Sequence, residues 1–244
     1  MEIQPIQTAD GSWTLYSEKF QEHYHSTKDG AFNEALYKHV FPALSLMKKR
    51  DLLIFDSNFG LGFNSLTTIS TILSSSRRAV IHSTEIDREL VQSLKEFPYP
   101  PFFEPLKDII KSLSEKGEYI SNNVEVYIHF QDTREFLQSW QGEKFDIIYQ
   151  DPFSPKVAPQ FWSVEYFELI KNVSHPETII TTYSTATPVR LALYENGFRV
   201  YSHTSEKVRE GTIASMKELA SLVEIDMEHK KRVSSKQPIW DRDY

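Results

Sequence analysis

The segment from Leu52 to Thr68, LLIFDSNFGLGFNSLTT, restricts the possible folds more than any other part of this sequence. Its apolar run ends at Asp56, and the turn that follows carries Asn58, Gly60 and Gly62. Glycine adopts positive φ angles and lets the backbone come close to a ligand, and asparagine is the other residue that tolerates this region best. The pattern predicts a strand, a tight turn and a helix, as in the nucleotide-binding turn of a doubly wound α/β sheet.

An acid at the end of the next expected strand indicates that this turn binds a ligand. Residues 79–84 (AVIHST) lead directly to Glu85, and an acid about 20 residues beyond a glycine turn can bind both hydroxyls of a ribose. The third glycine of a dinucleotide motif would fall on Ser65, so an adenosine ligand without a pyrophosphate fits better. S-adenosylmethionine is the commonest ligand of that kind. Glycine turns that bind nothing also exist, so the prediction depends on Glu85.

Length and composition narrow the class of protein. The 244 residues suffice for one sizeable α/β domain over 1–244, and no apolar run reaches the 18 or so residues that a membrane span needs. The N-terminus does not resemble a secretory signal, and the absence of cysteine excludes disulfides and thiolate metal sites. We therefore expect a cytoplasmic protein with no membrane partner. The net charge of -7 argues against coating of nucleic acid, although clusters such as Lys207 with Arg209 can form a local basic surface.

Residues 1–50 are expected to form an N-terminal extension to this domain. The Asp10-Gly11 pair predicts a β-hairpin, and residues 33–47 have the apolar spacing of an amphipathic helix that Pro42 kinks or splits. His23 and His25 lack an acid partner at metal spacing, so they are interpreted as surface or site-lining residues and no metal is expected.

Residues 98–120 interrupt the alternation of strands and helices. Three prolines are followed by a helical stretch rich in lysine and glutamate, which indicates an insertion at an edge of the sheet. The alternative is a flap that contacts the substrate.

Acids also follow the third and fourth expected strands. Asp132 follows residues 124–130, where it can accept the adenine amino group, cap the next helix, or do both. Residues 144–150 deliver Asp151-Pro152-Phe153-Ser154-Pro155 to the carboxyl edge of the sheet, where ligands of open α/β sheets bind. An aspartate there can hydrogen-bond an amine and take its proton, and Phe153 can stack on a base or shield a cation. A rigid turn is the alternative.

Four segments together resemble a known family. FGLGFNSL, DIIYQDPFSPKVAPQFWSVEYF, TTYSTATPVRLALYENGF and KVREGTIAS are similar, in this order, to the methyltransferase domain of the MnmC family. That domain completes 5-methylaminomethyl-2-thiouridine at the wobble position of certain tRNAs. The resemblance covers nearly the whole chain, and its pattern D-G-F-x-P-x-x-x-P-x-x-W is occupied by Asp151, Phe153, Pro155, Pro159 and Trp162, with Pro152 in place of the usual glycine.

The resemblance implies a Rossmann-like class I methyltransferase fold with a mostly parallel, seven-stranded sheet and helices on both faces. It implies that Asp151 orients and deprotonates the aminomethyl nitrogen of 5-aminomethyl-(2-thio)uridine. Substrate contacts are expected from Phe153, Pro155, Lys207 and Arg209. The residues expected to hold S-adenosylmethionine are Ser26, Gly30, Glu34, Asp56, Asn58, Phe59, Gly60, Gly62, Asn64, Glu85, Asp132, Thr133 and Asp151.

Bifunctional members of the family carry a flavin-dependent oxidase domain after this one. The present chain is expected to act without it, so that the 5-aminomethyl form of tRNA is methylated and the 5-carboxymethylaminomethyl form is not. The oligomeric state stays open, with a monomer among the possibilities.

Three other functions remain open from the sequence. An aminopropyl transferase has a related fold and also acts on amines. A nicotinamide-dependent dehydrogenase would share the glycine turn and Glu85 but would leave residues 151–155 without a role. A tRNA-binding protein without activity would need neither Glu85 nor Asp151.

Overall fold

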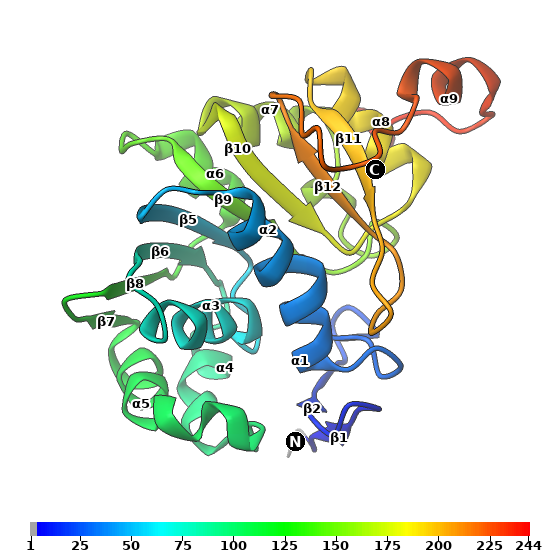
Figure 1. Cartoon of the computed structure of the whole chain (residues 1–244). Coiled ribbons are helices and arrows are strands. Elements are labelled where there is room, and N and C mark those ends of the chain that lie inside the picture. The colour runs from blue at the N-terminus through cyan, green and yellow to red at the C-terminus, as the bar shows by residue number, and fades with distance from the viewer. Residues whose placement is uncertain (1–3) are drawn as a thin grey trace.

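The computed structural model describes residues 4–244, and its centre is a sheet of eight strands in the order β11-β12-β10-β9-β5-β6-β8-β7 (Figure 1). The five strands from β10 to β8 in this order run parallel, whereas β7, β12 and β11 are antiparallel to their neighbours. The strands are β5 Asp51–Ser57, β6 Arg78–Thr84, β7 Glu118–Ile120, β8 Val124–His129, β9 Phe145–Gln150, β10 Ser174–Thr182, β11 Arg199–His203 and β12 Gly211–Ser215.

The predicted α/β class with a mostly parallel sheet is confirmed, but the sheet has eight strands and not seven. The additional strand is β7, which ends the 98–120 insertion and pairs antiparallel with β8 at the edge of the sheet. Gly117, with φ 76, turns the chain into β7. A strand of three residues is too short to show a readable alternation of polar and apolar residues.

Consecutive residues of the central strands point to opposite faces of the sheet, and each face has its own hydrophobic core. Ile147 of β9 belongs to one core and Ile148 to the other, and the same holds for Ile54 and Phe55 of β5. Buried strands with apolar residues at successive positions are typical of a parallel sheet that is covered on both sides. The sequence pattern of β5 and β9 therefore follows directly from their central place in the sheet.

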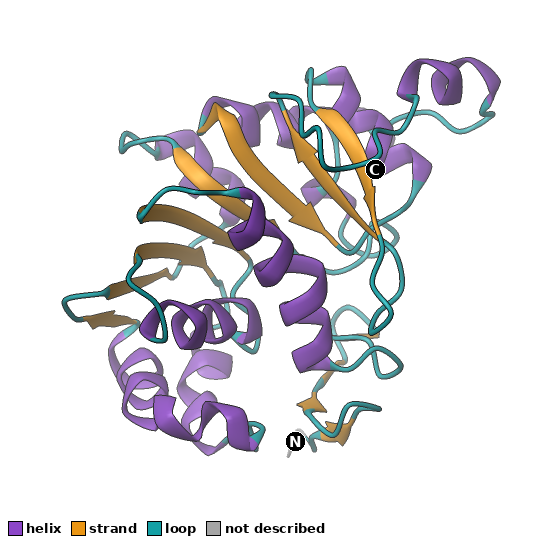
Figure 2. Ribbon diagram, in the orientation of Figure 1, coloured by secondary structure: helices purple, strands orange, loops and turns teal. Residues whose placement is uncertain are grey.

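Helices cover both faces (Figure 2). The N-terminal helix and the helices α3 to α5 pack on the first core, and α6, α7, α8 and the first residue of α9 pack on the second. These helices are α3 Phe63–Leu73, α4 Arg88–Ser93, α5 Lys107–Lys116, α6 Thr133–Ser139, α7 Val164–Asn172, α8 Thr187–Glu195 and α9 Met227–Val233. None of the helices in the described chain is long and apolar enough to cross a membrane.

The N-terminal helix consists of α1 (Ala31–Glu34), a π-helical segment (Ala35–Val40) and α2 (Phe41–Leu46). The helix predicted over 33–47 is thus present. Pro42 lies just after the π-helical segment, and a proline has no N–H with which to continue the α-helical hydrogen bonding. Segments of π-helix are uncommon and occur often at functional sites.

Two hairpins precede this helix. The predicted one pairs β1 (Ile6–Gln7) with β2 (Trp13–Thr14) around the Asp10-Gly11 turn. A second hairpin, β3 (Tyr16–Ser17) with β4 (Glu22–His23), was not predicted. It supplies part of the wall of the candidate site.

Candidate functional site

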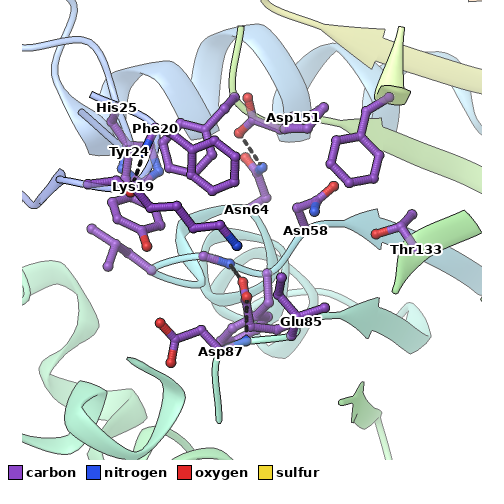
Figure 3. Close-up of a pocket in the computed structure, with 18 of the residues that line it drawn as sticks. Lys19, Phe20, Tyr24, His25, Asn58, Asn64, Glu85, Asp87, Thr133 and Asp151 are labelled. Carbon is purple, nitrogen blue, oxygen red and sulfur yellow. Dashed lines mark hydrogen bonds between the residues drawn. The ribbon is translucent and has the colours of Figure 1, made fainter. Parts of the chain in front are cut away.

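The carboxyl ends of four parallel strands converge on one cavity (Figure 3). Asn58 follows β5, Glu85 follows β6, Asp132 comes after β8, and Asp151 follows β9. All four side chains line this cavity, which we call the first cavity. The predicted residues Phe59, Gly60, Asn64, Thr133 and Phe153 line it as well.

The glycine turn has the left-handed backbone that the sequence predicts. Asn58, Gly60 and Gly62 have φ angles of 66, 53 and 72. A Cβ atom at Gly60 would lie 3.3 Å from the ring of Tyr24, and one at Gly62 would lie 2.7 Å from the ring of Phe59. Gly60 therefore faces the first cavity. Gly62 instead leaves room for the ring of Phe59 and is not among the residues that line the cavity.

Glu85 fixes the turn against the end of β6. Its Oε2 accepts the backbone N–H of Gly60 and its Oε1 accepts that of Asp87, both at 2.9 Å. Burial raises the pKa of Glu85, and the two N–H donors oppose this rise. Each carboxylate oxygen keeps a further lone pair, so Glu85 can still accept the two hydroxyls of a ribose.

Asp132 caps α6, as one of its two predicted roles requires. Its Oδ1 accepts the backbone N–H groups of Arg134 and Glu135 at 2.8 and 3.3 Å. The cap uses one carboxylate oxygen, and the other remains available to a donor such as an adenine amino group. The second predicted role stays a prediction.

The second hairpin forms a wall of the first cavity that was not foreseen. Phe20 stacks on Phe153 with ring centroids 4.4 Å apart, and Tyr24 lies 5.0 Å from the same ring. Lys19 and His25 also line the cavity, and burial lowers the pKa of His25. The only signal for this wall in the sequence is the density of aromatic and histidine residues in FQEHYH, because strands of two residues carry no periodicity.

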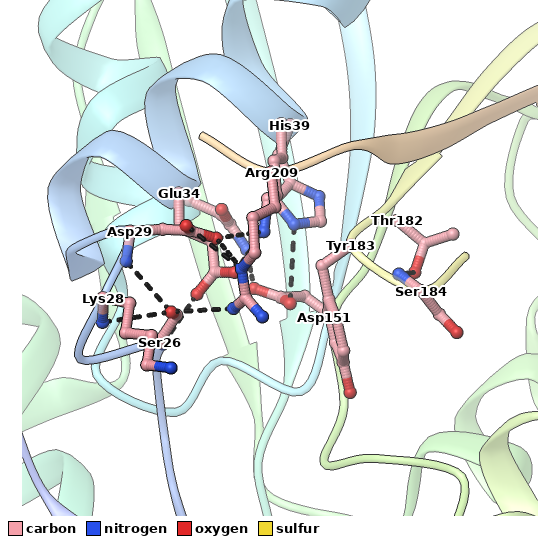
Figure 4. Close-up of polar contacts among 12 residues, drawn as sticks. Ser26, Lys28, Asp29, Glu34, His39, Asp151, Thr182, Tyr183, Ser184 and Arg209 are labelled. Atoms are coloured by element: carbon pink, nitrogen blue, oxygen red, sulfur yellow. Dashed lines mark hydrogen bonds and ion pairs between the residues drawn. The ribbon is translucent and has the colours of Figure 1, made fainter. Parts of the chain in front are cut away.

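The carboxylate of Asp151 is held from two sides. Asn64 Nδ2 donates to Oδ2 at 2.8 Å, and His39 Nε2 lies 3.4 Å from Oδ1 (Figure 4). Burial raises the pKa of Asp151, but the neighbouring imidazoles of His39 and His25 and the hydrogen bond from Asn64 outweigh burial and leave that pKa below its usual value. Asp151 is therefore an ionised carboxylate at neutral pH. His39 was not among the residues predicted for the site.

A second cavity adjoins the first one at Asp151. The two cavities share Tyr24, His25, Asp151, Pro152 and Phe153. Beyond these shared residues, the second cavity is lined by Glu22, His23, Ser26, Thr27, Lys28, Glu34, Ser154, Tyr183 and Arg209.

Two residues predicted on the methionine end of the cofactor lie in this second cavity. Ser26 donates its backbone N–H to Glu34 Oε2 at 2.9 Å, and both residues line the second cavity, whereas Glu85 lines the first. Glu34 also forms an ion pair with Lys38, whose Nζ lies 2.8 Å from Glu34 Oε1. Ser26 and Glu34 therefore line the second cavity and not the first, and their predicted contact with the cofactor stays a prediction.

Four other predicted residues lie outside the described lining of both cavities. Gly30 allows a close approach of Asp10, whose carboxyl atoms would lie 2.0 to 2.4 Å from a Cβ there. Asp56 is buried and accepts a hydrogen bond from Ser65 at 2.6 Å, and burial raises its pKa to about 7. The remaining two are Pro155 and Lys207, which is exposed in the loop before β12.

Arg209 comes from the same loop and reaches the second cavity, as its predicted contact with the substrate requires. Its Nε lies 3.2 Å from both carboxylate oxygens of Asp29, and its Nη2 donates to Ser26 Oγ at 3.0 Å. The side chain is nevertheless 67% exposed, so its remaining N–H groups are free to meet an anion at the mouth of the cavity.

The residues of the first cavity fit S-adenosylmethionine. Asn64 Oδ1 is buried and has no hydrogen-bond partner among residues 4–244, which leaves an acceptor for an ammonium group. Glu85 and Asp132 can accept hydrogen bonds from ribose hydroxyls and an adenine amino group, and Phe20, Tyr24 and Phe153 present aromatic rings that can face a cationic sulfur. Among the described residues, no three His, Cys, Asp or Glu side chains are grouped so that they could hold a metal ion.

Comparisons with known proteins agree with this geometry. Residues 102–217 match the family described as S-adenosyl-L-methionine-dependent methyltransferase. The crystal structure of MnmC2 from Aquifex aeolicus superposes with a TM-score of 0.79 and 31% sequence identity, over 94% of this chain and 74% of that one.

Two sequence relatives are longer than this chain. A protein of Methanocaldococcus jannaschii is 28% identical over 217 residues, which cover 87% of this chain and 59% of the relative. The tRNA 5-methylaminomethyl-2-thiouridine biosynthesis bifunctional protein MnmC of Leptospira interrogans is 26% identical over 216 residues, which cover 77% of this chain and 31% of the relative.

Proposed function

The chain belongs to the MnmC-like family of S-adenosylmethionine-dependent methyltransferases, and we propose that it N-methylates the aminomethyl group of 5-aminomethyl-(2-thio)uridine at the wobble position of tRNA. The observation that carries this proposal is the position of Asp151 in the wall between two adjoining cavities. A methyl donor in the first cavity and an amine in the second would meet at this carboxylate.

S-adenosylmethionine supplies a methyl group on a cationic sulfur, and the protein has to present a nitrogen with a free lone pair to it. Asp151 does this by accepting a hydrogen bond and then the proton from the acceptor nitrogen. Asn64 holds Oδ2 of Asp151 at 2.8 Å, so that the carboxylate has a fixed direction. Tyr24 and Phe153 line both cavities where they meet, and Phe20 stacks on Phe153 from the side of the first cavity.

The charges of the second cavity favour an amine over a carboxylate. Three carboxylates line it, those of Glu22, Glu34 and Asp151; Glu34 is paired with Lys38, and the cations Lys28 and Arg209 are exposed at the rim. A primary ammonium group is attracted into such a cavity, whereas the carboxymethyl group of 5-carboxymethylaminomethyluridine would be repelled and would also crowd the nitrogen. Selection of the aminomethyl form therefore has a physical basis in this cavity.

Exposed cations at the rim of the second cavity favour an RNA substrate. Lys28 and Arg209 line it and are exposed, and Lys207 lies two residues from Arg209 in the loop before β12. With a net charge of -7, the protein would depend on such local cations to bind phosphates.

The test is a methylation assay on tRNA from a strain that lacks the final modification, with each nucleoside followed by mass. The aminomethyl and carboxymethylaminomethyl forms are presented separately to the purified protein. We expect 5-methylaminomethyl nucleoside from the first form only, and a loss of about 10² or more in rate for Asp151→Asn, the range expected for a general base. Comparable methylation of the carboxymethyl form would contradict the proposed substrate, and full activity of Asp151→Asn would contradict the role of Asp151.

A further inference from the structure

The imidazole of His39 lies buried directly behind the carboxylate that we propose as the base. The side chain has no exposed surface, and it belongs to the π-helical segment Ala35–Val40. In this segment the neighbouring residues Lys38 and His39 are both turned inward, Lys38 toward Asp29 and Glu34 and His39 toward Asp151. Neither the sequence motifs nor the proposed mechanism gives His39 a role.

The two ring nitrogens of His39 have different surroundings. Nδ1 lies 3.1 Å from Oγ1 of Thr181 in β10, and Nε2 lies 3.4 Å from Oδ1 of Asp151. The distance to Asp151 is slightly longer than that of an ordinary N–H···O hydrogen bond, and Nε2 has no closer partner among residues 4–244. If the Thr181 hydroxyl donates to Nδ1, the imidazole proton lies on Nε2 and points at Asp151.

The other groups around His39 agree with this orientation. Tyr149 presents its ring edge-on, with centroids 6.2 Å apart, and the carboxyl groups of Asp151 and Asp56 both interact electrostatically with the imidazole. His25 and Tyr183 are further titratable groups near Asp151, and burial lowers the pKa of His25 and raises that of Tyr183. A ring nitrogen that faces a carboxylate in such surroundings is stabilised as a donor and destabilised as an acceptor.

We propose that His39 is a positioning residue, which donates a hydrogen bond from Nε2 to Asp151 and holds this carboxylate ionised and aimed at the acceptor nitrogen. This inference rests on the proposed function. In the reaction the acceptor nitrogen gives its proton to Asp151 and forms a bond to the methyl carbon, and the electron pair of the breaking carbon–sulfur bond stays on sulfur. His39 keeps its own proton throughout.

Two substitutions separate the hydrogen bond from simple packing. His39→Leu removes the donor, and His39→Gln can place an amide N–H near the position of Nε2. We expect kcat of His39→Leu to fall about tenfold or more, as for one lost hydrogen bond to a charged group, with most of it recovered in His39→Gln. The dissociation constant of S-adenosylmethionine should stay within about threefold, because the adenosine contacts come from other strands.

The dependence of this loss on pH is the signature of the proposed role. Without the donor, the burial of Asp151 is less opposed and the pKa of its carboxyl rises. The ratio of the two rates, His39→Leu over wild type, should therefore fall as pH decreases, because a larger fraction of Asp151 is protonated in the variant. A ratio independent of pH would reduce His39 to a packing residue and overturn the proposal.

His175 supplies a matched control. His175 lies near the opposite end of β10 from Thr181, and its Nε2 lies 2.9 Å from Oδ1 of Asp146. His175→Leu breaks a comparable histidine–aspartate contact away from the site, and it should leave the ratio of rates flat with pH. A slope equal to that of His39→Leu would contradict the proposal.

The protonation of His39 can be tested without any turnover, in case His39→Leu does not fold. Spectra of protein labelled with ¹⁵N-histidine should show the proton of His39 on Nε2, and Thr181→Val should change the tautomer balance while the chain stays folded. A neutral His39 with its proton on Nδ1 alone would overturn the inference. If wild-type protein fails to methylate aminomethyl tRNA, the proposed function fails, whereas the spectra still decide how His39 faces Asp151.

Discussion

Phe20 and Phe153 stack at 4.4 Å although 132 residues lie between them in the sequence. The contact joins the tip of the second hairpin to the loop after β9. Glu22 strengthens the same junction, since its carboxylate accepts hydrogen bonds from the backbone N–H and the hydroxyl of Ser154. The N-terminal extension therefore forms part of the site itself.

This stack leads to a prediction about cofactor retention. Phe20→Ala should raise the dissociation constant of S-adenosylmethionine about tenfold, because the exposed cofactor would lose roughly the 1.5 kcal/mol that burial against one aromatic side chain provides. Isothermal titration calorimetry measures the change, and Phe41→Ala, at a side chain 60% exposed on α2, is the control. An affinity equal to wild type would show that the hairpin does not enclose the cofactor.

Glu85 should carry a large part of cofactor affinity. Glu85→Gln keeps the shape of the side chain but removes its charge and one acceptor, and we expect binding to weaken at least tenfold, as hydrogen bonds to a charged acceptor contribute about 1.5 to 3 kcal/mol. Because Glu85 also holds the N–H groups of Gly60 and Asp87, thermal unfolding should be recorded in parallel. Glu89→Gln, in the exposed first turn of α4, is the matched control. Unchanged binding by Glu85→Gln would remove the ribose assignment.

The buried ion network under the second cavity should contribute strongly to stability. Lys38 Nζ lies 2.7 Å from Asp29 and 2.8 Å from Glu34, and all three side chains are at most 8% exposed. Lys38→Met should lower the free energy of unfolding by about 3 to 5 kcal/mol, because it leaves buried carboxylates without their cation. Lys107→Met, which breaks an exposed pair with Glu104, should cost less than about 1 kcal/mol in the same urea titration.

The same network predicts a dependence on pH. Burial raises the pKa of Asp29, but its bonds to Lys38 and the charges of Lys38 and Arg209 outweigh burial and hold it below the ordinary 3.8. A carboxyl with a depressed pKa stabilises the fold above its unfolded value and loses that contribution as pH falls through the folded value. The difference in stability between wild type and Lys38→Met should therefore shrink below about pH 4. A difference that stays constant down to pH 2 would exclude Asp29 as its source.

Binding of tRNA should depend on the cations of the loop before β12. Lys207→Ala should weaken binding and reduce the slope of log affinity against log salt by about 0.7 to 0.9, the range for one lost phosphate contact with single-stranded or duplex nucleic acid. Lys116→Ala, at the end of α5 beside the opposite edge of the sheet, is the control and should leave the slope unchanged. Equal slopes for Lys207→Ala and wild type would place the RNA elsewhere.

The parts of the fold and site that the sequence predicts are those with strong local signals. The central strands show continuous apolar runs, the glycine turn needs left-handed residues, and Asp132 caps the helix that follows it. The acids at the strand ends could be placed because parallel strands bring their carboxyl ends to one edge. Glu85 and Asp151 accordingly face the cavity as expected.

The parts that escaped prediction depend on contacts between distant residues. His39 is one polar residue within an amphipathic helix, and only the folded chain shows that it lies between Thr181 and Asp151. Ser26 and Glu34 precede or begin that helix, and only the folded chain shows that they line the second cavity and not the one that Glu85 lines. Strands as short as β3, β4 and β7 have too few residues for a period of two to be recognised.

The meeting of two cavities at one carboxylate also has a kinetic consequence. One cavity extends from Asp151 toward Glu85 and Asp132, and the other toward Lys28 and Arg209, so neither ligand has to leave before the other enters. Initial rates measured against both substrates should then give intersecting double-reciprocal lines, as a ternary complex requires, and not the parallel lines of a substituted enzyme. Under the proposed function, the spent donor can also depart while the methylated tRNA is still bound, so the order of product release is free to follow whichever ligand dissociates faster.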